Sequence, residues 1–245
     1  MNIRQIAGEN LKVRLGENPY PGRGVVLGVD ETGERLVQVY WIMGRSQNSR
    51  NRVFETDGTS VWTEAADPAL VKDPRLIIYN AVRELKGVFI VSNGDQTDTV
   101  YQTLLHGGTF EQALATRAYE PDAPNYTPRI TGVFDVRLGR RLAKLNVLRR
   151  SAHSDATDRL YWQYETLPAG AGYCITTYMG DGNPLPPFGG EPYAVPIVGG
   201  LGCIANTIWN ALDEDNKVSL CAKWIDPLTF ESELVVLNKY EKKKA

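Results

Sequence analysis

Three polar stretches of this chain carry side chains suited to binding a phosphorylated or otherwise polar ligand. Residues 90–99, IVSNGDQTDT, pass from an apolar run through Asn93-Gly94 into the start of an expected helix. Such a run places amides, carboxylates and hydroxyls beside the free N–H groups of a helix start. Two further stretches, RSQNSRNR (45–52) and YEPDAPNYTPR (119–129), also lie beside expected strands or helices. Together they predict a site for a polar ligand.

The 45–52 stretch is the most basic of the three. Arg45, Arg50 and Arg52 stand among serines and asparagines directly after an apolar strand. Guanidinium groups bind phosphate oxygens in a bidentate manner, and hydroxyls and amides complete the shell. The functional interpretation is therefore a phosphate site, and the alternative is a solvated, mobile loop.

Other motifs favour simpler interpretations. The segment GLGCIA (200–205), followed by Asp226, matches a dinucleotide-binding fingerprint, but no βαβ unit surrounds it, so helix-entry glycines are the better account. The two histidines, His106 and His153, lack metal-binding spacing and receive no role. A glycosylation sequon at Asn125-Tyr126-Thr127 has no meaning without an export signal.

Length and composition predict an ordinary globular protein. With 245 residues, no linker and no repeat, the chain is expected to form a single domain, and a formal charge of -2 argues against a nucleic-acid-binding protein. Cys174, Cys203 and Cys221 show neither disulfide nor zinc spacing, which suits a reducing cytoplasm. No signal or membrane segment is evident, and the basic tail 239–245 is expected to be solvated.

Strand patterns dominate the chain. Residues 24–29 and 36–43 flank a turn-rich DETGE segment, which predicts a hairpin, and residues 130–136 and 142–148 predict a second one. Alternating apolar and polar residues predict a strand over 218–224. Residues 61–63 and 233–238 are further strand candidates.

Three helices are expected. One covers residues 97–106, and the clearest covers residues 201–212, where apolar residues recur at helical spacing. Another starts at Thr109 with Gln112 in a capping box and presents Phe110, Ala113, Leu114 and Ala118 on one side. Many antiparallel strands with few helices imply sheets covered by helix layers.

The segment 73–91 is ambiguous. Asp73-Pro74 resembles a helix start, and Ile78, Ala81, Val82 and Leu85 keep helical spacing. The alternative is a strand over 76–83 that turns at Lys86-Gly87 into a second strand, 88–91.

Six strings, in this order, resemble the archaeal-type IMP cyclohydrolase family. They are YPGRG (20–24), GRSQNSRNR (44–52), Tyr79-Asn80, VSNGDQTDT (91–99), Tyr119-Glu120 and TPRI (127–130), and Tyr178 matches a later strand of the family. The resemblance implies an α+β fold like that of N-terminal-nucleophile hydrolases, an αββα sandwich of two antiparallel sheets. It favours the hairpin over the helix for 76–91. No processed nucleophile is expected, because residues 1–19 precede Tyr20.

The family reaction closes the purine ring of formylated aminoimidazole carboxamide ribotide (FAICAR) to IMP and releases water. The resemblance implies that Arg50, Tyr79 and Glu120 are catalytic, with no cofactor and no metal. Tyr79 would donate to the formyl oxygen or shuttle a proton, and Glu120 would accept from or orient the carboxamide. Arg50, with Arg45 or Arg52, would stabilise oxyanion or phosphate charge. The implied substrate contacts come from Arg23, Arg45, Ser46, Arg52, Asn80, Asn93, Gly94, Asp95, Thr97, Asp98, Arg129 and Tyr178. A cytoplasmic homo-oligomer, such as a tetramer, is also implied.

The chain departs from short archaeal members in its N-terminal extension, 1–19, and in a Pro/Gly-rich segment, 180–200. A loop of that length suits a lid or an oligomer contact. Two other functions remain open for this reason: a hydrolase or cyclase acting on a related ribotide, and a non-catalytic purine-nucleotide-binding protein.

Overall fold

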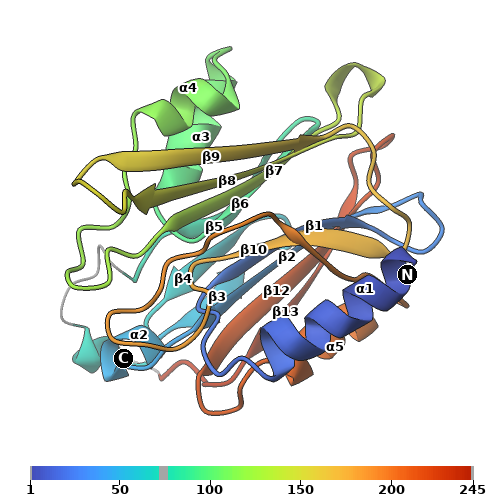
Figure 1. Ribbon diagram of the computed structural model, residues 1–245. Coiled ribbons are helices and arrows are strands. Elements are labelled where there is room, and N and C mark those ends of the chain that lie inside the picture. The colour runs from blue at the N-terminus through green and yellow to red at the C-terminus, as the bar shows by residue number, and fades with distance from the viewer. Residues whose placement is uncertain (1, 72–76, 244–245) are drawn as a thin grey trace.

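Two antiparallel sheets stack face to face in this protein (Figure 1). The structure is a computed structural model that describes residues 2–71 and 77–243. The six-stranded sheet has the order β11-β10-β1-β2-β12-β13 and the seven-stranded sheet the order β3-β4-β5-β6-β7-β8-β9. The six-stranded sheet contains β1 (Gly24–Val29), β2 (Leu36–Met43), β10 (Ala171–Thr176), β11 (Tyr193–Pro196), β12 (Lys217–Ile225) and β13 (Ser232–Asn238). The seven-stranded sheet contains β3 (Val53–Thr56), β4 (Val61–Glu64), β5 (Asn80–Leu85), β6 (Val88–Ser92), β7 (Arg129–Asp135), β8 (Leu142–Arg150) and β9 (Thr157–Tyr164).

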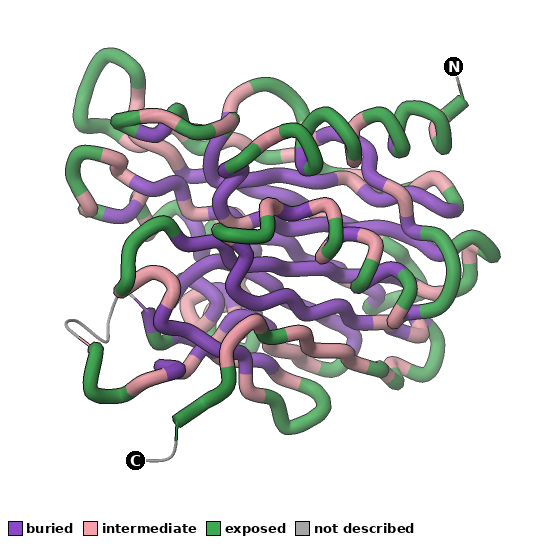
Figure 2. Tube along the Cα trace, turned by 90° about the horizontal axis from the view of Figure 1, so that it is seen from below, coloured by how far each residue is buried: buried purple, intermediate pink, exposed green. Residues whose placement is uncertain are grey.

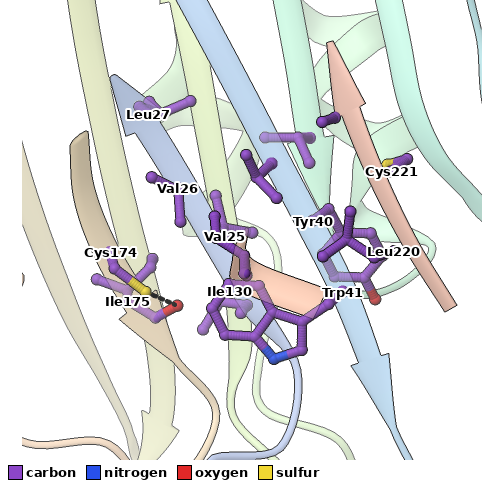
Figure 3. Close-up of a cluster of buried hydrophobic side chains, with 14 of the residues drawn as sticks. Val25, Val26, Leu27, Tyr40, Trp41, Ile130, Cys174, Ile175, Leu220 and Cys221 are labelled. Carbon is purple, nitrogen blue, oxygen red and sulfur yellow. Dashed lines mark hydrogen bonds between the residues drawn. The ribbon is translucent and has the colours of Figure 1, made fainter. Parts of the chain in front are cut away.

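The main core lies where the two sheets meet. Figure 3 shows side chains from both sheets in this core, among them Val25 of β1, Tyr40 of β2 and Ile130 of β7. All residues of β1 and β2 are buried, because other parts of the protein cover both faces of these strands. Continuous apolar runs are expected for strands in such a position, whereas a half-exposed strand alternates.

Helices cover the outer faces of the two sheets. α1 (Ile3–Asn10) packs on β11, and α5 (Leu201–Ala211) packs on β12 and β13. On the other sheet, α3 (Gln96–Leu105) packs on β5, β6 and β7 and contacts α4 (Phe110–Ala115). A second apolar cluster lies under α3 and α4 and contains Val100, Phe110 and Leu114. Figure 2 shows that the strands are mostly buried, while exposed residues gather on the helices and loops.

Several predicted elements are confirmed. Both hairpins, the strand at 61–63 and the strands near the C-terminus all form, and β1 pairs with β2 up to Val29 opposite Leu36. The three helices form, and Thr109 and Gln112 make the expected reciprocal cap. Ala118, however, does not belong to the helix face, because α4 ends at Ala115.

The ambiguous segment is a hairpin. β5 pairs with β6 from Val82 opposite Val91 to Leu85 opposite Val88, so the helix alternative is wrong over 80–85. Its expected start at Asp73-Pro74 lies outside the described residues. Pairing with β4 and β7 on either side of this hairpin outweighs the local helical spacing.

The sequence patterns missed several elements. α1 and the π-helical segment Leu11–Gly16 occupy the N-terminal extension, while β3, β9, β10 and β11 complete the sheets. Short helices also occur at Gln47–Arg50 (α2), Pro68–Leu70 (η2) and Arg137–Gly139 (η4). The short strands β3 and β11 have four residues each, too few for a periodic signal to stand out.

Contacts with other residues fix parts of the expected loop 180–200, and ion pairs fix Lys242 and Lys243 of the tail. Phe188 N–H donates to the carbonyl of Thr177 at 2.9 Å and Met179 N–H to that of Pro186 at 2.9 Å, while β11 lies within the same segment. In the tail, Lys242 pairs with Glu64, and Lys243 pairs with Asp67 at 2.7 Å. Among the residues that the structure describes, no helix is long and apolar enough to span a membrane.

Candidate functional site

The YPGRG string places Arg23 at the start of β1. Gly22 has φ +73°, and a Cβ atom there would lie 2.2 Å from the Thr177 hydroxyl. At Gly24 a Cβ atom would lie 1.9 Å from the Trp41 ring, which itself donates from Nε1 to the Gly22 carbonyl at 3.0 Å. Both glycines are therefore required by close approach, and they fix the backbone from which Arg23 extends.

Arg23 is the centre of a buried polar cluster. Its guanidinium lies 3.7 Å from the Glu120 carboxylate. Beside it, the hydroxyls of Tyr40 and Tyr79 share a hydrogen bond of 2.6 Å. Burial lowers the pKa of Arg23, but Glu120 and the phenols of Tyr79, Tyr40 and Tyr178 outweigh burial and the net effect is an increase. The guanidinium therefore stays charged.

Arg52 is the second cation of the cluster, and no carboxylate of the described residues pairs with it. The side chain is fully buried, and its Nε donates to the Ser49 carbonyl at 2.9 Å. Neither Nη1 nor Nη2 finds a hydrogen-bond partner in residues 2–71 and 77–243. Burial and the neighbouring charge of Arg23 lower the pKa of Arg52. An uncompensated buried cation is costly, so this arrangement favours an anionic ligand.

Glu120 is held in a setting that stabilises its protonated form. Burial raises its pKa above the ordinary value, although the charges of Arg23 and Arg129 oppose the increase. Its backbone N–H donates to the Thr127 carbonyl at 2.9 Å, which closes the loop 120–127. A carboxyl with a raised pKa is suited to proton transfer near neutral pH.

A cavity of about 210 Å³ adjoins this cluster. Arg23 and Tyr178 line it, and Tyr178 stacks on Tyr20 with ring centroids 6.0 Å apart. Glu120 and Tyr79 do not line the cavity, but both act on the pKa of Arg23, which does. The full lining is Tyr20, Gly22, Arg23, Met43, Arg45, Ser46, Ser49, Asp122, Asn125, Thr127, Thr177, Tyr178 and Leu185.

The segment 179–189 contributes Leu185 to the cavity lining and contacts two other lining residues, Arg45 and Asn125. Arg45 pairs with Asp181 and donates to the Gly182 carbonyl at 3.1 Å, while its guanidinium lies 4.9 Å from the centroid of the Tyr20 ring. On the same segment, Leu185 N–H donates to the Asn125 side chain at 3.0 Å. Ser46, beside Arg45, is the N-cap of the short helix α2 (Gln47–Arg50).

Arg50 lies apart from the cluster. Its Nε donates to the Gly44 carbonyl at 2.8 Å and its Nη2 to Asn216 at 3.1 Å. It lines a different hollow, together with Gln47, Asp67 and Tyr240. Of these two arginines, Arg52 is the one that is fully buried and on which the charge of Arg23 acts.

The SNGDQTDT string forms a network at the start of α3 and contributes nothing to the cavity lining. Asn93 joins β6 to β7, accepting from Ile130 N–H at 2.8 Å and donating to the Pro128 carbonyl at 2.9 Å. Ser92 and Thr97 share a hydroxyl hydrogen bond, and Thr97 also donates to the Gly94 carbonyl.

The acidic residues of this string are paired with basic side chains. Asp95 binds Arg117 at 2.5 Å and Arg129 at 2.7 Å, and Arg129 also donates to Gln96. Asp98 binds Arg83 at 2.7 Å and accepts from Asn80 at 3.0 Å. A Cβ atom at Gly94 would lie 2.6 Å from Arg129. These contacts position Arg129, whose charge acts on Glu120.

Several site residues had no individual role in the sequence reasoning. Tyr40 lies within an apolar strand, so its hydroxyl gave no signal distinct from core packing. Tyr20 and Thr127 belong to strings of the resemblance, but their side-chain roles depend on neighbours that only the fold provides. Asp122 lies between two of the strings.

The remaining motifs have structural explanations. In GLGCIA, Gly200 is the N-cap of α5 and the strand before it, β11, is antiparallel to β10. Asp226 accepts from Leu228 N–H at 2.8 Å in the turn before β13. Within the described ranges, no group of three or more His, Cys, Asp or Glu side chains is arranged to hold a metal ion.

Comparisons with known proteins show which family the chain resembles. A sequence model of the family described as IMP cyclohydrolase-like protein matches residues 20–229. The chain is 32% identical over 118 residues to the IMP cyclohydrolase of Methanothrix thermoacetophila and 31% identical over 142 residues to that of Methanocella arvoryzae. It is 28% identical over 123 residues to that of Methanosphaera stadtmanae.

These three matches cover 46%, 56% and 48% of this chain, and 57%, 67% and 59% of the relatives, in the same order. The matched regions therefore span between about half and two thirds of the length of these relatives. The family match itself extends over most of the chain, from Tyr20 to Thr229. The protein belongs to the IMP cyclohydrolase-like family.

Proposed function

We propose that this protein is an IMP cyclohydrolase that closes the ring of FAICAR to give IMP and water in purine biosynthesis. The single observation that carries the proposal is the buried cluster beside the cavity, where Arg23 pairs with Glu120 and, among the described residues, the buried Arg52 has no hydrogen-bond partner for Nη1 or Nη2. The excess positive charge suits a ribotide anion and the negative charge that develops on a formyl oxygen.

Ring closure needs the carboxamide nitrogen held against the formyl carbon, donors for the formyl oxygen, and a path for protons. In this proposal Tyr79 donates to the formyl oxygen, with Tyr40 holding its hydroxyl in place. Glu120, whose pKa is raised by burial, supplies the proton for the departing hydroxyl. Arg23 and Arg52 stabilise the negative charge.

The phosphate group is placed at the mouth of the cavity, near Arg45 and Ser46. Both residues line the cavity, and Arg45 already contacts a carboxylate, Asp181, that a phosphate can replace. Guanidinium groups bind carboxylates and phosphates with the same donor geometry. Arg52 thus takes the role that the sequence suggested for Arg50, because its guanidinium is the one beside Arg23.

The proposal extends to the setting of the enzyme. The two antiparallel sheets with outer helices support a fold like that of N-terminal-nucleophile hydrolases. A homo-oligomer, such as a tetramer, in the cytoplasm completes the proposal, and light scattering on the purified protein measures the oligomeric state.

The direct experiment supplies the purified protein with FAICAR and follows IMP by absorbance and chromatography. Formation of IMP well above the uncatalysed rate supports the proposal. No turnover above that rate would remove the enzyme function. If IMP then still raised the melting temperature, a non-catalytic nucleotide-binding protein would be the better conclusion.

A further inference from the structure

Three side chains on one wall of the cavity form a hydrogen-bonded chain. The Thr127 hydroxyl lies 2.6 Å from the Tyr178 hydroxyl and also bonds to Oδ2 of Asp122. The second carboxylate oxygen, Oδ1, accepts from the Thr127 backbone N–H at 2.6 Å. All three residues line the cavity. Thr127 and Tyr178 are only 2% and 4% exposed, so their hydroxyls are shielded from bulk water, while Asp122 at the end of the chain is half-buried.

The chemistry of these groups fixes the direction of each hydrogen bond. An ionised carboxylate only accepts, so the single Thr127 hydroxyl proton must point to Asp122. The Thr127 oxygen can then only accept from Tyr178, which uses the one phenolic proton. Tyr178 therefore turns lone pairs, and no proton, toward the cavity. Burial raises the pKa of Tyr178 although the charge of Arg23 and the hydrogen bond with Thr127 oppose the increase, so the phenol keeps its proton at neutral pH.

The position of Tyr178 is well determined. Its ring stacks on Tyr20, its backbone N–H donates to the Pro21 carbonyl at 3.1 Å, and its carbonyl accepts from the Thr176 hydroxyl at 2.9 Å. Arg23 lines the same cavity and offers only donors. A ligand group between Arg23 and Tyr178 must therefore accept from one and donate to the other. A primary carboxamide has both a carbonyl oxygen and N–H donors.

We propose that Tyr178, Thr127 and Asp122 form a proton relay that accepts the N–H of the ribotide carboxamide during ring closure, with Asp122 as the terminal base. This inference rests on the proposed function and assigns it a base. As the carboxamide nitrogen bonds to the formyl carbon, its proton passes to the Tyr178 oxygen. The Tyr178 proton passes to Thr127, and the Thr127 proton passes to Asp122. The electron pair of the formyl C=O moves to its oxygen, which takes the proton of Glu120. The Glu120 carboxylate then takes the remaining N–H proton of the former formamide nitrogen and delivers it to the new hydroxyl, which leaves as water.

Thr127 provides the sharpest test, because two conservative variants separate the hydroxyl of the relay from the shape of the side chain. Thr127→Val removes the hydroxyl while keeping the shape and the backbone bond to Asp122, and Thr127→Ser keeps the hydroxyl. We expect Thr127→Val to lower kcat by about 10² or more, with the affinity for IMP and the melting temperature nearly unchanged. Thr127→Ser should retain most of the activity.

Thr131→Val is the matched control. Thr131 is a buried threonine of β7 whose hydroxyl has no hydrogen-bond partner among the described residues, so its loss should leave kcat unchanged. The relay would be overturned if Thr127→Val kept kcat within a few-fold of the wild-type protein. It would equally be overturned if kcat and IMP affinity fell by the same factor, since Thr127 would then only shape the cavity.

A binding measurement separates this inference from the proposed function. If the wild-type protein does not turn over FAICAR, the proposed function fails, and calorimetry still tests the hydrogen-bond direction. The wild-type protein should bind the unformylated carboxamide ribotide about tenfold or more tightly than the same ribotide carrying a methyl ester, which is equally neutral but has no N–H donor. In Thr127→Val the Tyr178 proton becomes free to donate, so this ratio should narrow. If the ratio of the two affinities were the same in Thr127→Val as in the wild-type protein, the proposed direction of the hydrogen bonds would be rejected.

Discussion

Arg52 shows most clearly, at the scale of single residues, how a buried charge points to a ligand. We expect Arg52→Met to weaken IMP binding by about 10- to 100-fold, because a charge-assisted hydrogen bond contributes about 1.5–3 kcal/mol. The same change should raise the melting temperature, since it removes a buried cation whose Nη atoms have no partner within the described part of the chain. Isothermal titration and thermal unfolding measure the two effects.

Arg50→Met is the matched control for this prediction. Both arginines come from the same stretch, and both changes remove one positive charge, but Arg50 contacts Gly44 and Asn216 outside the cluster. Its loss should change IMP affinity by only a few-fold. If Arg50→Met weakened IMP binding more than Arg52→Met does, Arg50 would instead be the anion-binding residue.

Glu120 should govern the pH dependence. Its folded-state pKa lies above the ordinary value of 4.5, so the folded protein binds its proton more tightly than the unfolded chain. The contribution of Glu120 to the free energy of unfolding is therefore largest at low pH. It falls as pH rises from 4.5 through the raised pKa.

Because the proposed role needs the protonated carboxyl, activity should also decline as pH rises through the same pKa. Glu120→Gln should lower kcat by about 10²–10⁴ and remove this limb from the profile of kcat against pH. If kcat of Glu120→Gln still declined as pH rises, a group other than Glu120 would be responsible for the decline.

At the scale of elements, the N-terminal cap of α4 makes a measurable contribution to the free energy of unfolding. Thr109 accepts from the Gln112 N–H at 3.1 Å, and Gln112 reciprocates at 2.8 Å. Thr109→Ala should lower the free energy of unfolding by about 1 kcal/mol in urea titrations. Thr109→Ser should recover most of the loss, because serine caps equally well. Equal losses in both variants would mean that packing of the threonine methyl, and not capping, is responsible.

The segment 179–189 should compete with the substrate phosphate for Arg45. Removing the carboxylate of Asp181 frees the Arg45 guanidinium, so Asp181→Asn should tighten IMP binding by up to about fivefold, the range of an exposed ion pair. Glu9→Gln, an exposed change of the same charge on α1, should have no effect. Weaker binding in Asp181→Asn would show that the pair instead holds Arg45 ready for the phosphate.

At the scale of the whole molecule, the N-terminal extension belongs to the folded core even though the family match begins at Tyr20. Leu15 is fully buried in the main core, and its segment contacts α5. Leu15→Ala should lower the free energy of unfolding by about 2–5 kcal/mol in urea. Val13→Ala, at a position 44% exposed, should change it by about 0.5 kcal/mol or less. Similar effects of the two changes would show that the extension is only loosely attached.

The sequence by itself determined the elements whose signals are local. The periodicity of 201–212, the Thr109 cap and the two hairpin turns each depend on residues within one segment, and the structure has them where the patterns predicted. The family could also be identified, because its short strings keep their order along the chain. Contacts within a few residues decide such features, so one-dimensional patterns suffice.

Only the tertiary structure decided which side chains meet. The segment 76–91 has helical spacing but becomes a hairpin, because strands on both sides pair with it. Arg50 and Arg52 are two residues apart and alike in sequence, yet one faces Asn216 and the other lies buried beside Arg23. Asp122, Thr127 and Tyr178 come together across 51 residues from Thr127 to Tyr178. Long-range packing and burial set these contacts, and no local pattern encodes them.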